Sequence, residues 1–290
     1  MFKIKNKAPV DNLRGAFLLV AAAAIFTLDV TILRYLSPEV QFGQIIFFRS
    51  LSQLVIVTIW IAVRSHLHYG SSKWRMLILR GITSLICWWL YYASFQKLEL
   101  AVASTLTFST SLFVVLLAPF VLAERIDLKR GFVTFLGFFG VVLASGITGF
   151  RVELGVILGL GSAFFAAILI CQNRILAQTE KTATIMFWIG LVATLGTFPS
   201  ALIGWVELSH YNILMMSIAG MLASFGMLLT VEAYRFGEVS ALAPFPYSRI
   251  LFAILAGYFL FNEKLQLIEF IGAFVILGCG IFASKTERSC

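Results

Sequence analysis

Residues 14–36 read RGAFLLVAAAAIFTLDVTILRYL, a nearly continuous apolar run. A helix needs about 20 such residues to cross the hydrocarbon core of a bilayer, so this stretch predicts a membrane-spanning helix. Lysines precede the run, and a cleaved signal peptide with processing near the alanines at 21–24 is the alternative interpretation. Because the run continues past those alanines to Leu36, its length favours a span.

The composition extends this interpretation to the whole chain. Of the 290 residues, 60% are hydrophobic and 12% are charged, and the mean hydropathy is +0.95. Soluble domains carry about 25% charged residues. We therefore expect an all-α integral membrane protein with no sizeable extramembrane domain. Apolar stretches between charged or turn-forming breaks predict ten spans, near residues 14–36, 41–63, 75–96, 100–121, 130–148, 153–175, 182–205, 211–235, 239–260 and 266–284.

The basic residues indicate how the spans are oriented. With a cytoplasmic N-terminus, 15 Lys and Arg fall in inner segments and 3 in outer loops. Cytoplasmic loops carry such an excess, so we expect a multi-pass protein of the inner membrane with both tails, 1–13 and 285–290, in the cytoplasm. The net charge of +8 does not indicate nucleic-acid binding, because the basic residues lie in short connections rather than on one folded face.

The two halves of the chain resemble each other after a shift of about 140 residues. Each half, 14–148 and 153–284, contains five predicted spans, so the second copy must cross the bilayer in the opposite sense. Inverted repeats are typical of secondary transporters, which bind substrate near the midplane between the halves. Chance similarity between apolar helices is the alternative. The aligned pairs include Gly15 and Gly155, Arg34 and Arg174, Glu99 and Glu238, and Glu124 and Glu263.

Short motifs stand at particular places in this pattern. They are Phe47-Phe48-Arg49 in the second span, Leu79-Arg80-Gly81 at the start of the third, and the connections at Glu124 and Glu263. In this order and spacing, the chain resembles the EamA-type ten-helix members of the drug/metabolite transporter superfamily over nearly its whole length. The resemblance implies transport of amino acids, nucleotide-like metabolites, S-adenosylmethionine, riboflavin or drugs without ATP hydrolysis. The first span departs from the family pattern: it lacks a frequent Trp-Gly pair and carries Asp29, which leaves the substrate open.

Charged residues inside the predicted spans are functional candidates, because a charge at the helix centre costs about 2.5–3.5 kcal/mol. Arg49, Arg249 and Asp29 lie deepest. An internal ion pair or a carbonyl clamp is the structural alternative for the two arginines. Asp29 is a candidate for coupling to a proton or for binding a cationic group. Arg80 lies near the cytoplasmic end of its span, where we expect snorkelling or a structural pair.

Proline is expected to break the ninth span. Pro244 and Pro246 each lack a backbone donor and clash with the preceding turn. A broken helix at membrane depth is tolerated only inside the protein or along a cavity. We therefore predict that Tyr247, Ser248 and Arg249 contribute to a substrate site in a central cavity.

Hydroxyl and aromatic side chains extend the predicted site. Thr107 and Thr110 lie in the fourth span, where Thr110 aligns with Arg249 in the repeat. The alternative to a role in binding is that these hydroxyls donate hydrogen bonds to backbone carbonyls of their own helix. Trp88 lies near the middle of the third span, which also contains Tyr92, and both are candidates for stacking on a flat ligand, with core packing as the alternative.

Two further pairs of residues predict contacts within the fold. Gly155 and Gly159 form a GxxxG step that favours close helix packing. Glu232 and Arg235 are three residues apart and are expected to form a pair on one helix face.

The sequence contains no phosphate loop of the form GxxxxGK[ST], no HExxH and no GxSxG. Its four cysteines form no paired metal motif, so neither a cofactor nor a metal is expected. An enzyme is disfavoured.

The deep charges favour a zwitterionic or anionic metabolite as the partner. We expect a secondary transporter that moves an amino acid, S-adenosylmethionine or another nucleoside-type compound by alternating access. The alternatives are a passive channel and a membrane-embedded lipid enzyme.

Overall fold

The computed structural model describes residues 11–36, 40–64, 69–95, 97, 106–124, 128–144, 154–203, 205–261 and 267–286. Within this part, all regular secondary structure is helical. The predictions that concern most of the two tails, Glu99, Glu263, and the side chains of Arg34 and Tyr92 lie outside the described residues.

Each predicted span corresponds to a helix in the described part of the chain. The long helices are α1 (Asn12–Leu36), α2 (Phe42–Val63), α3 (Trp74–Phe95), α5 (Thr110–Leu122), α6 (Leu128–Ala144), α7 (Leu154–Ala177), α8 (Thr182–Leu202), α9 (His210–Phe236), α11 (Ser248–Phe261) and α12 (Leu267–Thr286). Between α9 and α11 lie the short α10 (Val239–Leu242) and the 3₁₀ helix η1 (Phe245–Tyr247).

Six segments of the described residues are long and apolar enough to cross a membrane. A shorter apolar helix covers Leu106–Leu122. The helices α5 and α6, with 13 and 17 described residues, are shorter than a full span. The six segments are Asn12–Ile32, Gly43–Val63, Leu154–Ala177, Thr182–Leu202, His210–Phe236 and Val239–Leu260.

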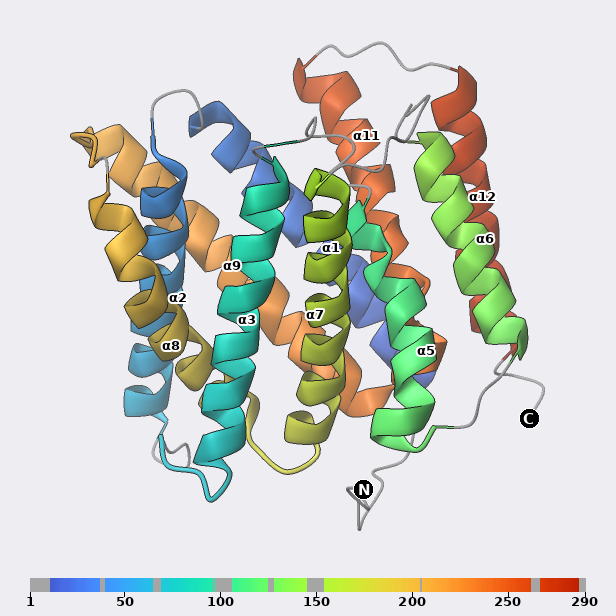
Figure 1. Cartoon of the computed structure of the whole chain (residues 1–290), viewed down its shortest axis with the longest axis horizontal. Helices are drawn as coiled ribbons and strands as arrows, with labels where there is room; N and C mark the ends of the chain where they lie inside the picture. Colours follow the sequence, from blue (N-terminus) through green and yellow to red (C-terminus); the bar gives the residue numbers. More distant parts are fainter. Residues whose placement is uncertain are drawn as a thin grey trace.

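The helices alternate in direction along the chain (Figure 1). The start of α1 and the end of α12 lie at the same end of the molecule, the lower end in that view. Four helix pairs make extensive contacts: α1 with α9, α2 with α8, α3 with α7, and α6 with α12. Each pair joins a helix from before residue 146 to one from after residue 153. The two halves of the chain therefore interleave and do not form separate lobes.

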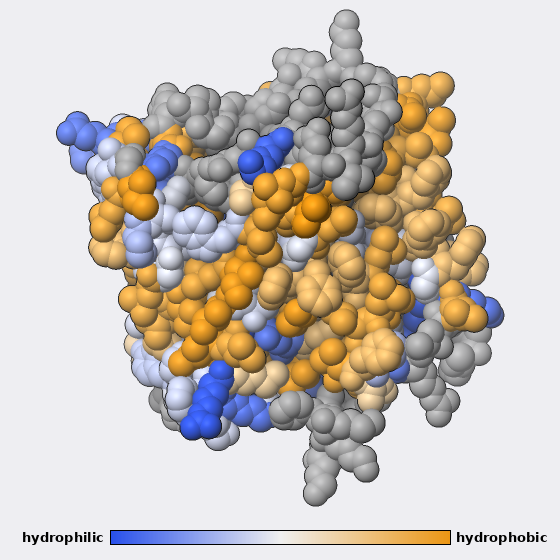
Figure 2. All heavy atoms as spheres, in the orientation of Figure 1, coloured by the Kyte–Doolittle hydropathy of each residue, from blue (hydrophilic) through white to orange (hydrophobic). Residues whose placement is uncertain are grey.

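Apolar side chains fill the interior and also cover much of the surface. A buried cluster joins α1, α5, α7, α9 and α10 through residues such as Leu19, Val114, Cys171 and Leu242. On the outside, large residues are exposed, including Phe120 at 83%. Figure 2 shows this mostly apolar surface across the middle of one face, with hydrophilic residues mainly toward its ends. A surface of this kind suits contact with lipid, where burial inside the protein is not required.

The predicted close packing at the GxxxG step is confirmed between α3 and α7. The Ser94 hydroxyl donates to the carbonyl of Gly155 at 2.9 Å. A Cβ atom at Gly159 would lie 2.7 Å from Leu106 Cδ1 and 2.9 Å from Ser94 Oγ. Glycine at 159 therefore allows neighbouring segments to approach more closely than any other residue would permit.

Candidate functional site

The deepest charges of the first two helices form an ion pair. Asp29 on α1 lies with Oδ2 2.5 Å from Arg49 Nη2 on α2. The Asp29 side chain is fully buried, whereas that of Arg49 is 32% exposed. Neither carboxylate oxygen accepts a well-aligned hydrogen bond within the described residues. The structural alternative considered for Arg49, an internal ion pair, is thus present.

A third charge joins this pair from the other half of the chain. Arg249 lies in the first turn of α11, and its guanidinium carbon is 6.0 Å from the centroid of the Phe26 ring on α1. Phe26 lies about one helical turn before Asp29 on α1, so Arg249 lies close enough to the Asp29–Arg49 pair for the three charges to influence one another. We call Asp29, Arg49 and Arg249 the deep charge cluster. It receives side chains from α1, α2 and α11.

The break predicted before Arg249 is confirmed. The chain leaves α10 at Leu242, passes through η1 and enters α11 at Ser248. The amide of Tyr247 donates to the carbonyl of Pro244 at 3.2 Å, and the Ser248 hydroxyl donates to the carbonyl of Phe245 at 2.7 Å. Because these local bonds close tight turns around the prolines, the regular α-helix is interrupted there, and Arg249 lies in the first turn of the helix that follows.

Tyr247 lies beside Arg249 in sequence but has different surroundings. Its side chain is fully buried, and its hydroxyl donates to the carbonyl of Thr134 on α6 at 3.2 Å. The ring packs with Val141 and Ile276 and contacts Phe108 at a centroid distance of 6.1 Å. Tyr247 therefore fills the space between α6, α12 and the start of the α5 segment. We do not include it in the deep charge cluster.

The other predicted binding residues are less closely tied to the cluster. Thr107 and Thr110 are partly buried on either side of a turn at Ser109, where α5 begins. Trp88 is partly buried on α3. The structure thus brings Arg249, Arg49 and Asp29 together, while the roles of the remaining predicted residues stay predictions.

Arg80 forms the structural pair predicted as one of its alternatives. The side chain is only 2% exposed, so it does not snorkel to the surface. Its Nε donates to Asn173 Oδ1 on α7 at 3.0 Å, and its Nη1 donates to the Ser84 hydroxyl. A buried guanidinium needs such partners. Arg80 therefore joins α3 to α7.

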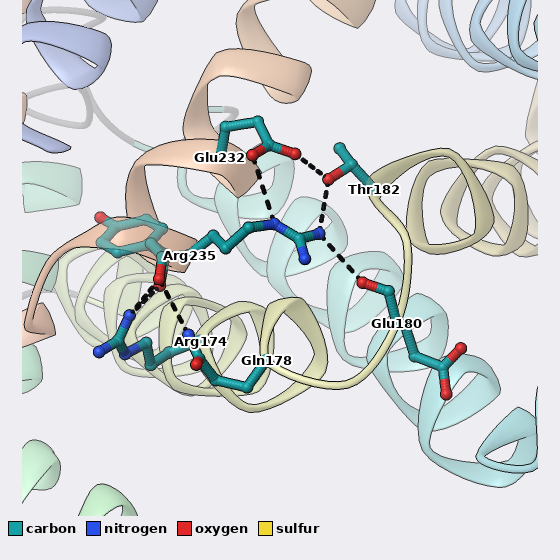
Figure 3. A network of polar contacts seen from close by, with 7 residues as sticks. Arg174, Gln178, Glu180, Thr182, Glu232 and Arg235 are labelled. Carbon is teal, nitrogen blue, oxygen red and sulfur yellow. Dashed lines mark hydrogen bonds and ion pairs between the residues drawn. The ribbon is translucent and has the colours of Figure 1, made fainter. Parts of the chain in front are cut away.

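The predicted Glu232–Arg235 pair is also confirmed, with Nε and Oε2 3.3 Å apart. It belongs to the larger polar network in Figure 3. Arg235 donates to the carbonyl of Glu180 at 3.0 Å and to the Thr182 hydroxyl at 2.8 Å. Arg174 donates to the carbonyl of Arg235 at 2.8 Å. The network fixes the end of α9 against the connection between α7 and α8.

Polar contacts also join the two halves beside this network. Glu124, which follows α5, accepts hydrogen bonds from the amides of Val239 and Ser240 at 3.0 Å each. Arg130 on α6 forms an ion pair with Glu238 at 2.7 Å. The sequence alignment of the repeats selected Glu124 but did not indicate that its carboxylate caps α10.

Comparisons with known proteins place these observations in a family. The sequence matches the EamA-like transporter family over residues 13–146 and 153–284. The chain belongs to this family, which is part of the drug/metabolite transporter superfamily. The EamA-family membership shows that the protein is a transporter rather than an enzyme. Together with the apolar helices, it shows a multi-pass membrane protein.

Individual relatives of this EamA-family chain are distant but extend over nearly its full length. An S-adenosylmethionine uptake transporter of Rickettsia prowazekii (strain Madrid E) is 22% identical over 98% of this chain and 96% of the relative. The pseudopaline exporter CntI of Pseudomonas aeruginosa (strain UCBPP-PA14) is 24% identical over 94% and 97%. A crystal structure at 16% identity has a TM-score of 0.78 and covers 96% of this chain and 97% of that chain. The structural likeness concerns the fold alone.

Proposed function

We propose that this EamA-family protein is a secondary transporter of the inner membrane that moves a small organic metabolite by alternating access. The metabolite classes are amino acids, S-adenosylmethionine and other nucleoside-type compounds. The observation that carries the proposal is the deep charge cluster beside a broken helix. Charges at membrane depth mark substrate or ion pathways, and broken helices form the binding sites of many transporters.

The proposal includes an inverted repeat, and equivalent close contacts support it. A Cβ atom at Gly81 on α3 would lie 2.5 Å from Val192 Cβ on α8. A Cβ atom at Gly220 on α9 would lie 2.5 Å from Ser52 Cβ on α2. The second contact repeats the first when the halves are exchanged, since 220 and 81 differ by 139 and 192 and 52 by 140. The opposite directions of α1 and α7 in Figure 1 agree with this arrangement.

The proposed site contains Arg249 and Arg49 as groups for a carboxylate or phosphate. Thr107, Thr110, Ser248 and Trp88 are proposed as further contacts. Arginine suits this role because its guanidinium donates two parallel hydrogen bonds to one carboxylate or phosphate. Asp29 is proposed either to couple transport to a proton or to bind a cationic group of the substrate. Both termini are proposed to be cytoplasmic, in agreement with the distribution of basic residues.

Counterflow in proteoliposomes tests the mechanism. Vesicles loaded with unlabelled S-adenosylmethionine or a mixture of amino acids are diluted into the labelled compound. We expect transient, saturable accumulation that Arg249→Ala lowers at least about tenfold, as removal of a buried charge from a binding site does. Flux that rises linearly with concentration and shows no exchange would indicate a channel and contradict the proposal. Arg75→Ala, at an exposed arginine on α3, is the matched control.

A further inference from the structure

Only one of the two Asp29 oxygens has an ionic partner among the described residues. Oδ2 meets Arg49, whereas Oδ1 is buried and has no hydrogen-bond partner among the described residues. An unsatisfied polar atom in the interior costs free energy, and such atoms are uncommon in native proteins unless a water, an ion or a ligand supplies the missing donor. The Asp29 carboxylate therefore has acceptor capacity for a donor that is not part of the described chain.

Arg49 is able to give up its position beside Asp29. Its side chain is 32% exposed, so the protein does not enclose Arg49 on all sides and leaves the guanidinium room to move away from the carboxylate. Asp29 is fully buried and cannot be hydrated in the same way. Leaving a buried charge without its partner is strongly destabilising, so separation requires another cation at Asp29. A protonated amine of a solute meets that requirement.

Arg249 provides a group of the opposite charge in the same cluster. Among the described residues, no carboxylate lies within ion-pair distance of its guanidinium, which packs over the ring of Phe26. Phe26 and Asp29 are three residues apart on α1 and so share a helix face. A cation without a paired carboxylate thus packs on a residue that lies about one helical turn before a carboxylate with spare acceptor capacity.

We propose that the substrate carries an α-amino acid head group. Its ammonium replaces Arg49 at Asp29, and its carboxylate binds the guanidinium of Arg249. This inference rests on the proposed function of the deep charge cluster as a transport site, and it narrows the substrate class. Nucleosides and organic anions that lack an ammonium group leave Asp29 without a second donor and are poor substrates. Compounds that carry the head group supply an ammonium for Asp29 and a carboxylate for Arg249.

Matched probes separate the head group from the rest of the ligand. Purified protein is titrated with phenylalanine, methionine and S-adenosylmethionine, and separately with phenethylamine, 3-phenylpropionate and 5′-methylthioadenosine, which lack one or both charged groups. Binding is measured from the rise in melting temperature. We expect at least one probe with the head group to bind at least about tenfold more tightly than its truncated analogue. Equal binding of the analogue, or no binding of any probe with the head group, overturns the inference.

Substitutions of Asp29 and Arg249 test which residue binds the ammonium and which binds the carboxylate. Asp29→Asn is expected to weaken the probe with the head group at least about tenfold while leaving 3-phenylpropionate unchanged or stronger. Arg249→Gln is expected to weaken binding of the probe with the head group and of 3-phenylpropionate while leaving phenethylamine unchanged. Each variant therefore tests the assignment by itself if the other fails to fold. Asp11→Asn, at an exposed carboxylate preceding α1, is the control. Uniform weakening of all probes by both variants would indicate a structural role and overturn the proposal.

The two proposals fail in different ways. If counterflow occurs but shows no preference for the head group, transport stands and the substrate class is wrong. If probes with the head group bind selectively but no solute shows counterflow, the site stands and the transport mechanism is wrong.

Discussion

Arg80 shows how the protein holds a buried charge that has no place in the proposed transport site. The guanidinium is enclosed between α3 and α7 and is bonded to Asn173 and Ser84. Hydrogen bonds to charged groups contribute more to stability than neutral ones, because a full charge attracts its partner more strongly and a buried charge that loses a partner stays without hydration. The Arg249 guanidinium lies instead over the ring of Phe26, so the two arginines have different surroundings.

We predict that Asn173→Ala lowers the free energy of unfolding by about 1.5–3 kcal/mol, since it removes an acceptor from the buried Arg80 guanidinium. The measurement is the melting temperature or denaturation midpoint of the purified protein. Ser217→Ala serves as the control, because the Ser217 hydroxyl bonds back to the carbonyl of Ile213 in its own helix. Equal losses in the two variants would contradict a special role for the Arg80 pair.

At this scale the sequence identifies the important residues better than their partners. Asp29, Arg49 and Arg249 stand out because charges in apolar runs are costly. The Asp29–Arg49 pair was not predicted, although depth offers a signal: Asp29 lies seven residues before the end of α1, and Arg49 lies seven after the start of α2. Tyr247 shows the limit of such predictions. It lies two residues before Arg249 in the sequence, but the sequence does not indicate in which direction the 3₁₀ turn points its ring.

Helix pairs in this protein depend on glycines at their closest contacts. At Gly43 on α2, a Cβ atom would lie 2.8 Å from the carbonyl carbon of Ser200 on α8. At Gly190 on α8, it would lie 3.2 Å from Leu54 Cα on α2. Because these neighbours are backbone atoms, the helices must separate to admit a methyl group. Close approach of this kind drives association between helices in a membrane, where the hydrophobic effect between them is absent.

Gly43→Ala is expected to destabilise the protein by about 1–3 kcal/mol through overpacking of α2 against α8. Gly278→Ala is the matched control, because nothing lies within 4 Å of a Cβ atom at this position on α12. In the control, the higher helix propensity of alanine should leave stability unchanged or slightly raised. Thermal melts of both variants measure the difference. A Gly43→Ala protein as stable as the Gly278→Ala protein would argue against tight α2–α8 packing.

The cap on α10 leads to a separate prediction for the broken helix. Glu124 accepts from two free amides at the start of α10, where a carboxylate also interacts favourably with the helix dipole. Glu124→Ala should cost about 1–2 kcal/mol and loosen the segment that leads to Arg249. Hydrogen exchange of the amides of Val239 and Ser240 measures the local effect. Glu207→Ala, at an exposed glutamate, is the control, and equal protection in both variants would exclude the capping role.

Elements were predicted well because the membrane fixes their lengths. Most helix ends lie within a few residues of the predicted spans, and Pro244 and Pro246 located the break. Contacts between elements were harder to predict from the sequence. The role of Glu124 depends on the end of α5 meeting the start of α10, residues 115 apart in sequence. Periodicity along one helix does not contain that information.

At the scale of the whole molecule, one group of polar contacts joins the two halves at the end where α1 begins. Asp11 donates its amide to the carbonyl of Phe236 at 3.0 Å, and the Asn12 side chain accepts from the amide of Glu238 at 2.6 Å. Glu238 also pairs with Arg130. These contacts hold the halves together at that end. The proposed alternating access would require these contacts to separate once in each cycle, and each contact would then have to be weak enough to break reversibly.

The orientation of the molecule is open to a direct test. The start of α3 and the connection between α8 and α9 lie at opposite ends of the molecule in Figure 1, and they carry the exposed residues Arg75 and Trp205, respectively. If basic loops face the cytoplasm, Arg75 is inside and Trp205 outside. Single cysteines at these positions are placed in a Cys290→Ser background, since the other three cysteines are buried.

A membrane-impermeant maleimide should then label Trp205→Cys in intact spheroplasts, and Arg75→Cys only after permeabilisation. The Cys290→Ser parent, without either added cysteine, measures labelling of the buried thiols. Labelling of both sites from one side would mean that the chain crosses the membrane an even number of times between them, instead of an odd number. The alternation of helices, and with it the opposite insertion of the two halves, would then be wrong. The reverse pattern, with Arg75→Cys labelled outside, would preserve the alternation and refute only the cytoplasmic placement of the termini.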